Sequence, residues 1–174
     1  MNPIRTIAAL FLLALGACAN YGGHGLTVGK SSVDDALRIM GTPAMEWTNP
    51  DGSRQLAFTR GPAGAHTYML HIGSDGKLTS MANVLAPPTF SRIQAGMSSD
   101  DVLRLLGPPQ PAWTVYFERR NELAWEWRYC DDWNQFARFA VLFDGSTRIV
   151  RSSLTRSESQ ISECGDTGGC WCSH

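Results

Sequence analysis

The amino-acid sequence predicts an α+β protein made of two tandem units, each a short helix or helix pair packed on a three- to four-stranded antiparallel sheet. Residues 29–43 recur in altered form at residues 96–109. Each copy is followed by runs in which apolar and polar residues alternate and which end at turns, the pattern of antiparallel strands. An export signal precedes both copies, so the folded part is expected outside the cytoplasm.

The repeat is defined by the order of its residue types. In both copies a pair of aspartates is followed by an apolar residue, a Leu-Arg step, two apolar residues, a glycine and then a proline. From the aspartates onward the copies are offset by 107 − 41 = 66 residues, measured between Gly41 and Gly107. Self-similarity at a fixed period indicates two structural units of the same kind.

Each copy predicts a helix of about two turns. In the second copy Ser98 and Asp101 have the spacing of a capping box, with aspartate in place of the usual glutamate, and Ser32 and Asp35 repeat this spacing in the first. Gly107 is a natural C-terminal stop, reinforced by the proline after it. Because so short a helix is not stable alone, it has to pack on a sheet.

Alternating runs and turn residues place the strands. In the first unit we expect strands at residues 54–59, 66–72 and 77–84, and in the second at residues 112–117, 123–129, 136–143 and 148–154. An additional short helix is expected at residues 89–94, where the first unit has glycines instead.

The N-terminus has the form of a lipoprotein signal peptide. Arg5 precedes an apolar run at residues 7–17, which is too short to span a membrane. The sequence Leu15-Gly16-Ala17-Cys18 resembles the lipobox of bacterial lipoproteins. This resemblance implies cleavage before Cys18 and acylation of Cys18 (with palmitate, for example), which gives a stable anchor. Ala19 in the next position favours the outer membrane, facing the periplasm. The alternative is an ordinary signal peptide with a chance cysteine.

These features divide the chain into five segments. They are a signal peptide (1–17), a lipidated linker (18–28), a first unit (29–85), a second unit (89–156) and a cysteine-containing tail (157–174). Cleavage leaves 174 − 17 = 157 residues, enough for one domain or two small ones. The net charge of −1 becomes −2 when Arg5 is removed, and without a basic cluster we expect no nucleic-acid partner.

Four cysteines remain after Cys18: Cys130, Cys164, Cys170 and Cys172. In an oxidising compartment they predict disulfides, with three possible pairings. A bridge between Cys170 and Cys172 would close a very small ring, so we expect Cys130 to pair with one cysteine of the tail. The alternative is a metal site formed by the tail cysteines and His174, since thiolates and histidine suit zinc or copper(I). It is disfavoured because the spacing is not Cys-x-x-Cys, and we expect no bound metal.

The sequence contains no motif that brings catalytic groups together. The histidines lie in unrelated contexts, and no nucleophile elbow, phosphate-binding loop or zinc-protease helix is present. We therefore expect no enzymatic activity and no cofactor. The aromatic residues are expected to divide between core and surface, and tryptophan and tyrosine are enriched in interfaces. The candidate partner-binding residues are Trp125, Trp127, Trp133 and Tyr116.

The second unit also resembles a known family. Residues 91–98 (Ser-Arg-Ile-Gln-Ala-Gly-Met-Ser), Val102, the run Leu105-Leu106-Gly107-Pro108-Pro109, an aromatic strand and Phe143-Asp144 resemble the SmpA/OmlA (BamE-like) outer-membrane lipoproteins. This implies a non-catalytic protein-interaction module that contacts outer-membrane protein assembly components or another envelope protein, in assembly or envelope integrity. Tandem units are similar in layout to β-lactamase inhibitor protein, which suggests as the alternative a tethered periplasmic binder or inhibitor of a soluble protein.

Overall fold

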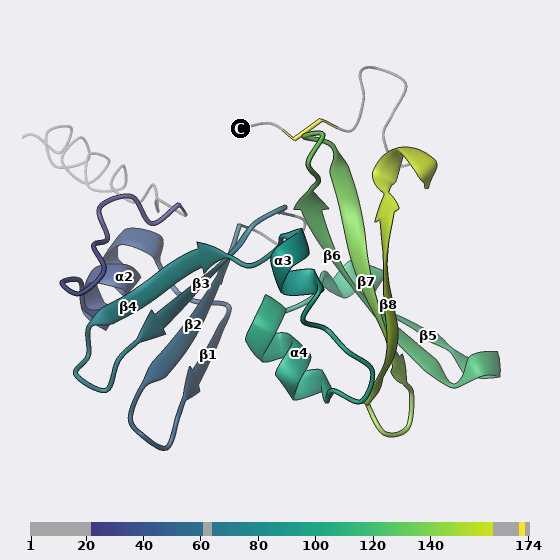
Figure 1. Cartoon of the computed structure of the whole chain (residues 1–174), viewed down its shortest axis with the longest axis horizontal. Coiled ribbons are helices and arrows are strands. Elements are labelled where there is room, and N and C mark those ends of the chain that lie inside the picture. Colours follow the sequence, from purple (N-terminus) through teal and green to yellow (C-terminus); the bar gives the residue numbers. More distant parts are fainter. Residues whose placement is uncertain (1–21, 61–63, 162–170, 173–174) are drawn as a thin grey trace, which may run out of the picture.

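The computed structural model describes residues 22–60, 64–161 and 171–172 and has an α+β fold (Figure 1). It contains two four-stranded antiparallel sheets, ordered β1–β2–β3–β4 and β5–β6–β7–β8, together with a few short helices. Among the described residues, no helix is long and apolar enough to cross a membrane. The predicted signal peptide, Cys18, Cys164 and Cys170 lie outside the described residues.

The first sheet follows helix α2, and the second follows α3 and α4. The first set comprises α2 (Val33–Met40), β1 (Met45–Thr48), β2 (Arg54–Thr59), β3 (Thr67–Ile72) and β4 (Leu78–Asn83). The second comprises α3 (Pro87–Phe90), α4 (Ser99–Leu106), β5 (Val115–Phe117), β6 (Glu122–Cys130), β7 (Phe136–Asp144) and β8 (Val150–Ser157). Three 3-10 turns also occur in this part: η2 (Pro111–Trp113), η3 (Glu118–Arg120) and η4 (Glu158–Gln160).

The strand predictions are largely confirmed, and two strands and one helix differ from expectation. Strand β1 was not expected, because its sequence Met-Glu-Trp-Thr is too short to show clear alternation. The strand expected at residues 112–117 covers only Val115–Phe117, because Pro111 begins a 3-10 turn. The helix expected at residues 89–94 begins at Pro87 and ends at Phe90, since proline suits the first helical position.

Both predicted capping boxes are present. The Ser98 hydroxyl accepts a hydrogen bond from the Asp101 backbone N–H (3.2 Å), and the Asp101 carboxylate accepts one from the Ser98 backbone N–H (3.0 Å). Ser32 and Asp35 repeat this arrangement at the start of α2. There the backbone N–H of Ser32 is the largest influence on the pKa of Asp35, which is lowered to about 2. The local sequence alone therefore determines where each helix begins.

Helix α2 packs on one face of the first sheet. Its buried residues are Val33, Ala36 and Met40. They form one apolar cluster with Leu56, Phe58, Leu70, Ile72 and Leu78 of the sheet. The amphipathic face of α2 is thereby buried, as its short length requires.

A larger core lies between α3, α4 and the second sheet. Val102 and Leu106 of α4 are fully buried in it. Phe90 of α3 stacks on Phe139 of β7 with ring centroids 4.1 Å apart, and meets Tyr129 edge-on at 4.8 Å. These aromatic contacts of α3 and the buried aliphatic residues of α4 attach both helices to the same face of the sheet.

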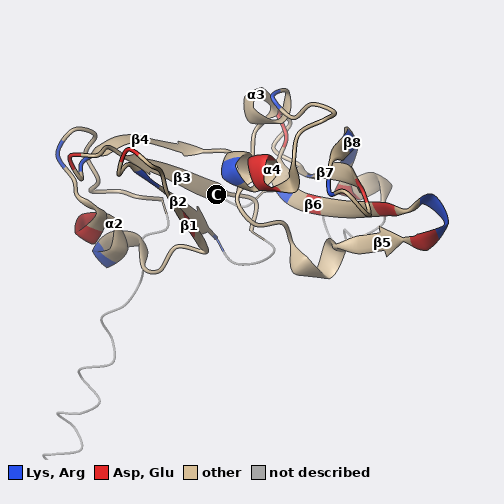
Figure 2. Ribbon diagram, turned by 90° about the horizontal axis from the view of Figure 1, so that it is seen from below, with Lys and Arg blue, Asp and Glu red and all other residues tan. Residues whose placement is uncertain are grey.

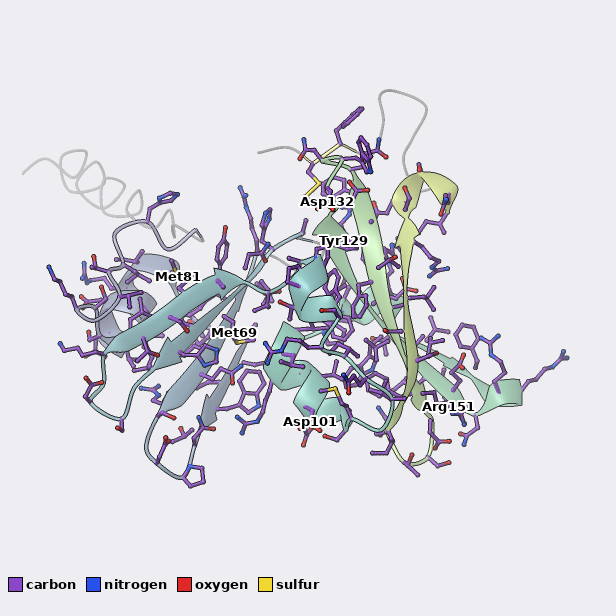
Figure 3. All side chains as sticks on the ribbon, in the orientation of Figure 1. Met69, Met81, Asp101, Tyr129, Asp132 and Arg151 are labelled. Carbon is purple, nitrogen blue, oxygen red and sulfur yellow. A yellow bond between two sulfur atoms is a disulfide. The ribbon has the colours of Figure 1, made fainter. Side chains whose placement is uncertain are left out.

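Helix α4 also contacts the first sheet, on the face opposite α2. The Gln55 side chain donates to the backbone carbonyl of Arg104, and the Arg104 guanidinium donates to Asn49 Oδ1 (3.1 Å). On this face Gln55, Ala57, Thr67 and Met69 are all buried. Figures 1 and 2 show the resulting order of layers, α2, first sheet, α4, second sheet, and Figure 3 shows Met69 on the first sheet.

The end of α4 offers a test of this contact. Gly107 has φ 74°, and an added Cβ would lie 2.9 Å from Thr67 Cγ2 and 3.3 Å from Ala57 Cβ. We predict that Gly107→Ala lowers the free energy of unfolding by about 2–4 kcal/mol, through backbone strain and steric overlap. Gly76 has φ 76° with nothing within 4 Å of the added atom, so Gly76→Ala is the matched control for strain alone. Equal losses in urea unfolding would contradict the proposed contact.

Candidate interaction surfaces

The four aromatic residues predicted to bind a partner divide between core and surface. Trp127 is 2% exposed, and its indole N–H donates to the Gly107 carbonyl (3.1 Å). Trp125 is partly buried and packs against Phe143 with ring centroids 4.7 Å apart. Both are corrected to core residues, because their face of β6 is the one that α4 covers. Tyr116 and Trp133, by contrast, are 52% and 79% exposed.

Tyr116 belongs to a patch that the sequence did not fully reveal. Strand β5 exposes three successive apolar residues, Val115, Tyr116 and Phe117, which we call the hairpin patch. Alternation predicts that one face of a strand is buried, but β5 lies at the sheet edge and neither of its faces is covered. Figure 2 shows the charged residues of η3 at the tip of this hairpin.

Asn121 holds the hairpin patch in place through hydrogen bonds. The Asn121 side chain accepts a hydrogen bond from the Tyr116 hydroxyl (2.8 Å) and donates one to Ser146 Oγ (2.9 Å). The backbone carbonyl of Asn121 accepts a hydrogen bond from the Gly145 N–H (2.8 Å). Arg151 also donates to the Arg120 carbonyl (2.9 Å). These bonds tie the hairpin to the β7–β8 turn, so the exposed residues are presented on an ordered support.

The turn that holds the hairpin is itself organised by Asp144. The backbone N–H of Thr147 (2.9 Å) and the side chain of Arg151 (2.5 Å) hydrogen-bond its carboxylate and lower its pKa to about 2. The carboxylate is therefore ionised at neutral pH, as these contacts require.

The second exposed candidate, Trp133, lies at the other end of β6. A disulfide joins Cys130 to Cys172, in agreement with the prediction that Cys130 pairs with a tail cysteine. The Cys172 N–H donates to the Asn134 carbonyl (2.9 Å), and Trp133 and Trp171 are both exposed beside this link. Figure 3 shows Asp132 at this end and Arg151 near the other. With the length of β6 between them, about 27 Å, Tyr116 and Trp133 do not form one site.

The face of the second sheet opposite α4 carries a chain of ion pairs, which we call the Arg–Glu network. Its members alternate in charge in the order Arg128, Glu158, Arg138, Glu126 and Arg156. Arg138 lies 3.2 Å from each carboxylate, and its guanidinium stacks on the Trp113 ring at 3.5 Å. Glu158, which the sequence assigned to the tail, is completely buried.

The network gives this face a structural role. In the first sheet the equivalent face is buried under α4, whereas in the second sheet Trp113 of η2 and Glu158 of η4 lie on it. Buried charges are tolerated only when they are paired, and here each carboxylate contacts two guanidinium groups.

This role predicts a large effect of Glu158→Gln, which removes one charge but keeps the shape. We expect the free energy of unfolding to fall by about 3–5 kcal/mol, because two arginines lose a buried partner. Glu46→Gln is the matched control, since the Glu46–Arg54 pair is about one-third exposed and should contribute about 0–1 kcal/mol. Urea unfolding measures both. Losses of similar size would show that the network is not a structural element.

Neither a metal site nor a relative identifies the function. Within the described part of the chain, no group of three or more His, Cys, Asp or Glu side chains is placed to hold a metal ion, and Cys164, Cys170 and His174 lie outside it. No family model, curated protein or solved structure matches the chain.

Proposed function

We propose that this protein is an outer-membrane-anchored lipoprotein that faces the periplasm and acts as a non-catalytic protein-interaction module, in outer-membrane protein assembly or envelope integrity. The lipobox-like sequence ending at Cys18 and the BamE-like pattern of the second unit support this proposal. The two helix-on-sheet units are compatible with a tandem of such modules.

The hairpin patch is the observation that carries the interaction role. Three successive apolar residues of a strand remain exposed, Tyr116 on one face and Val115 and Phe117 on the other, although burying them would be favourable. Tyrosine is enriched at the energetic centres of interfaces. Because Asn121 already orders the hairpin, little conformational freedom has to be lost when a partner binds. A protein surface is therefore the occupant that fits this patch.

The anchor would keep the fold close to the membrane. The predicted linker spans residues 18–28, and a chain of that length reaches at most about 40 Å when fully extended. A body tethered so closely meets membrane-associated proteins at a high effective concentration. This geometry favours an envelope partner over a freely diffusing one.

The test is a crosslinking pull-down from native membranes with three forms of the protein. We predict that the wild type is membrane-bound and recovers assembly components or another envelope protein. Cys18→Ala should appear in the soluble fraction because the acylated thiol is missing. A Tyr116→Ser, Phe117→Ser double variant should stay membrane-bound and lose at least about 90% of the partner, a loss of about 1.4 kcal/mol in binding.

A double variant in Val28 of the linker and Leu37 of the first unit, both exposed and apolar, is the matched control and should keep the partner when both residues are changed to serine. Membrane-bound Cys18→Ala would contradict the anchor, and undiminished recovery by the hairpin variant would contradict the patch. Recovery of only a soluble periplasmic protein would favour a tethered binder or inhibitor.

A further inference from the structure

Strand β8 presents an open edge. It is the last strand of the second sheet and pairs only with β7. At its first residue the outer side is occupied, since the Val150 N–H donates to the Met97 carbonyl (2.8 Å) and the Val150 carbonyl accepts from the Gly96 N–H (2.9 Å). Over residues 151–157, no described residue forms a backbone hydrogen bond to this side. A free edge of this length can accept another strand.

The corresponding edge in the first unit differs in charge. Strand β4 is occupied at its first residue in the same way, since the Leu78 N–H donates to the Ser31 carbonyl and the Leu78 carbonyl accepts from the Gly29 N–H. Its sequence Leu-Thr-Ser-Met-Ala-Asn carries no charge, whereas β8 carries Arg151 and Arg156. The two edges therefore offer the same backbone groups in different electrostatic surroundings.

The Arg–Glu network leaves positive charge at the β8 edge. It contains three arginines and two glutamates, so its formal charge is 3 − 2 = +1. Its most exposed member is Arg156, whose side chain is 41% exposed. The Nε of Arg156 is buried and has no hydrogen-bond partner among the described residues. An added carboxylate beside Arg156 would balance the excess charge.

A second copy of the chain fits this edge poorly. Two paired β8 strands would bring Arg151 and Arg156 of both copies to one shared edge, and β8 carries no acidic residue that could balance them. Like charges directly opposite in a sheet are destabilising, whereas opposite charges stabilise the pair. A strand that carries carboxylates supplies the negative charge that a second β8 strand lacks.

We infer that the outer edge of β8 binds an extended acidic segment of a partner protein, which adds a strand to the second sheet and places a carboxylate beside Arg156. Backbone hydrogen bonds hold the segment, and Arg156 selects for an acidic side chain on its own face of the sheet. This inference rests on the proposed interaction role and concerns a surface separate from the hairpin patch.

A synthetic peptide of about nine residues, in which glutamate and threonine alternate, is the probe. The peptide is titrated into the folded protein and amide hydrogen exchange is measured. At saturation, the bound peptide should slow exchange at residues 151–157 by about tenfold or more. The amides of β4 should be unaffected. Affinity should fall when the salt concentration rises from about 50 to about 500 mM. A lysine–threonine peptide and a backbone N-methylated acidic peptide should not bind.

A protein variant tests the same edge. Leu154→Glu adds a carboxylate two residues from Arg156 on the same face of the sheet. It should lower the affinity for the acidic peptide by about fivefold or more. Ala82→Glu, exposed on β4, is the matched control and should leave the affinity unchanged. Absent binding, equal binding of the lysine peptide, or protection located elsewhere would overturn the inference. If the hairpin variant still loses its partner in the pull-down, the proposed function stands although the edge inference fails.

Discussion

One short helix is buried on two sides, and the rest of the structure depends on it. Val102 and Leu106 bury one side of α4 in the core of the second sheet. The helix backbone at Arg104 and the glycine that ends the helix lie against the back of the first sheet. A helix of about two turns has almost no stability of its own. It persists because both sheets pack on it, and the two sheets are held together through it.

This arrangement explains why the two outer layers differ. The first sheet is covered on both faces, by α2 and by α4, so polar Gln55 and small Ala57 and Thr67 are buried on its back. Among the described residues, the α-helices α3 and α4 lie on one face of the second sheet, and the Arg–Glu network with the 3-10 turns η2 and η4 lies on the other. Surfaces left for partners then lie at the rims: the hairpin patch, the disulfide end and the β8 edge. The proposed interaction role uses the hairpin patch, and the proposed binding of an acidic strand uses the β8 edge.

Features that depend on neighbouring residues could be predicted from the sequence. The capping boxes, the glycine stops and most strands follow from spacing and alternation, and each is present. Features that depend on distant contacts could not be predicted. Glu158 lies in what the sequence marks as a tail, and only the folded sheet brings it to Arg128 and Arg138. Which tail cysteine meets Cys130 is likewise set by the tail path along Asn134.

The aromatic residues also show which features follow from neighbouring residues and which follow from distant contacts. Alternation correctly places Trp125 and Trp127 on one face of β6, but it does not say which face is covered. The exposed Val115 and Phe117 have no sequence signal that separates them from core strand residues. Their exposure follows from the position of β5 at the edge of the sheet, which is a property of the whole topology.

The central claim, that α4 makes the two units one cooperative structure, is tested most directly by differential scanning calorimetry of the mature chain with its disulfide intact. The account predicts a single transition with a ratio of calorimetric to van't Hoff enthalpy of about 1. Two separate transitions, or a ratio of about 2, would show that the units unfold independently and that α4 does not join them.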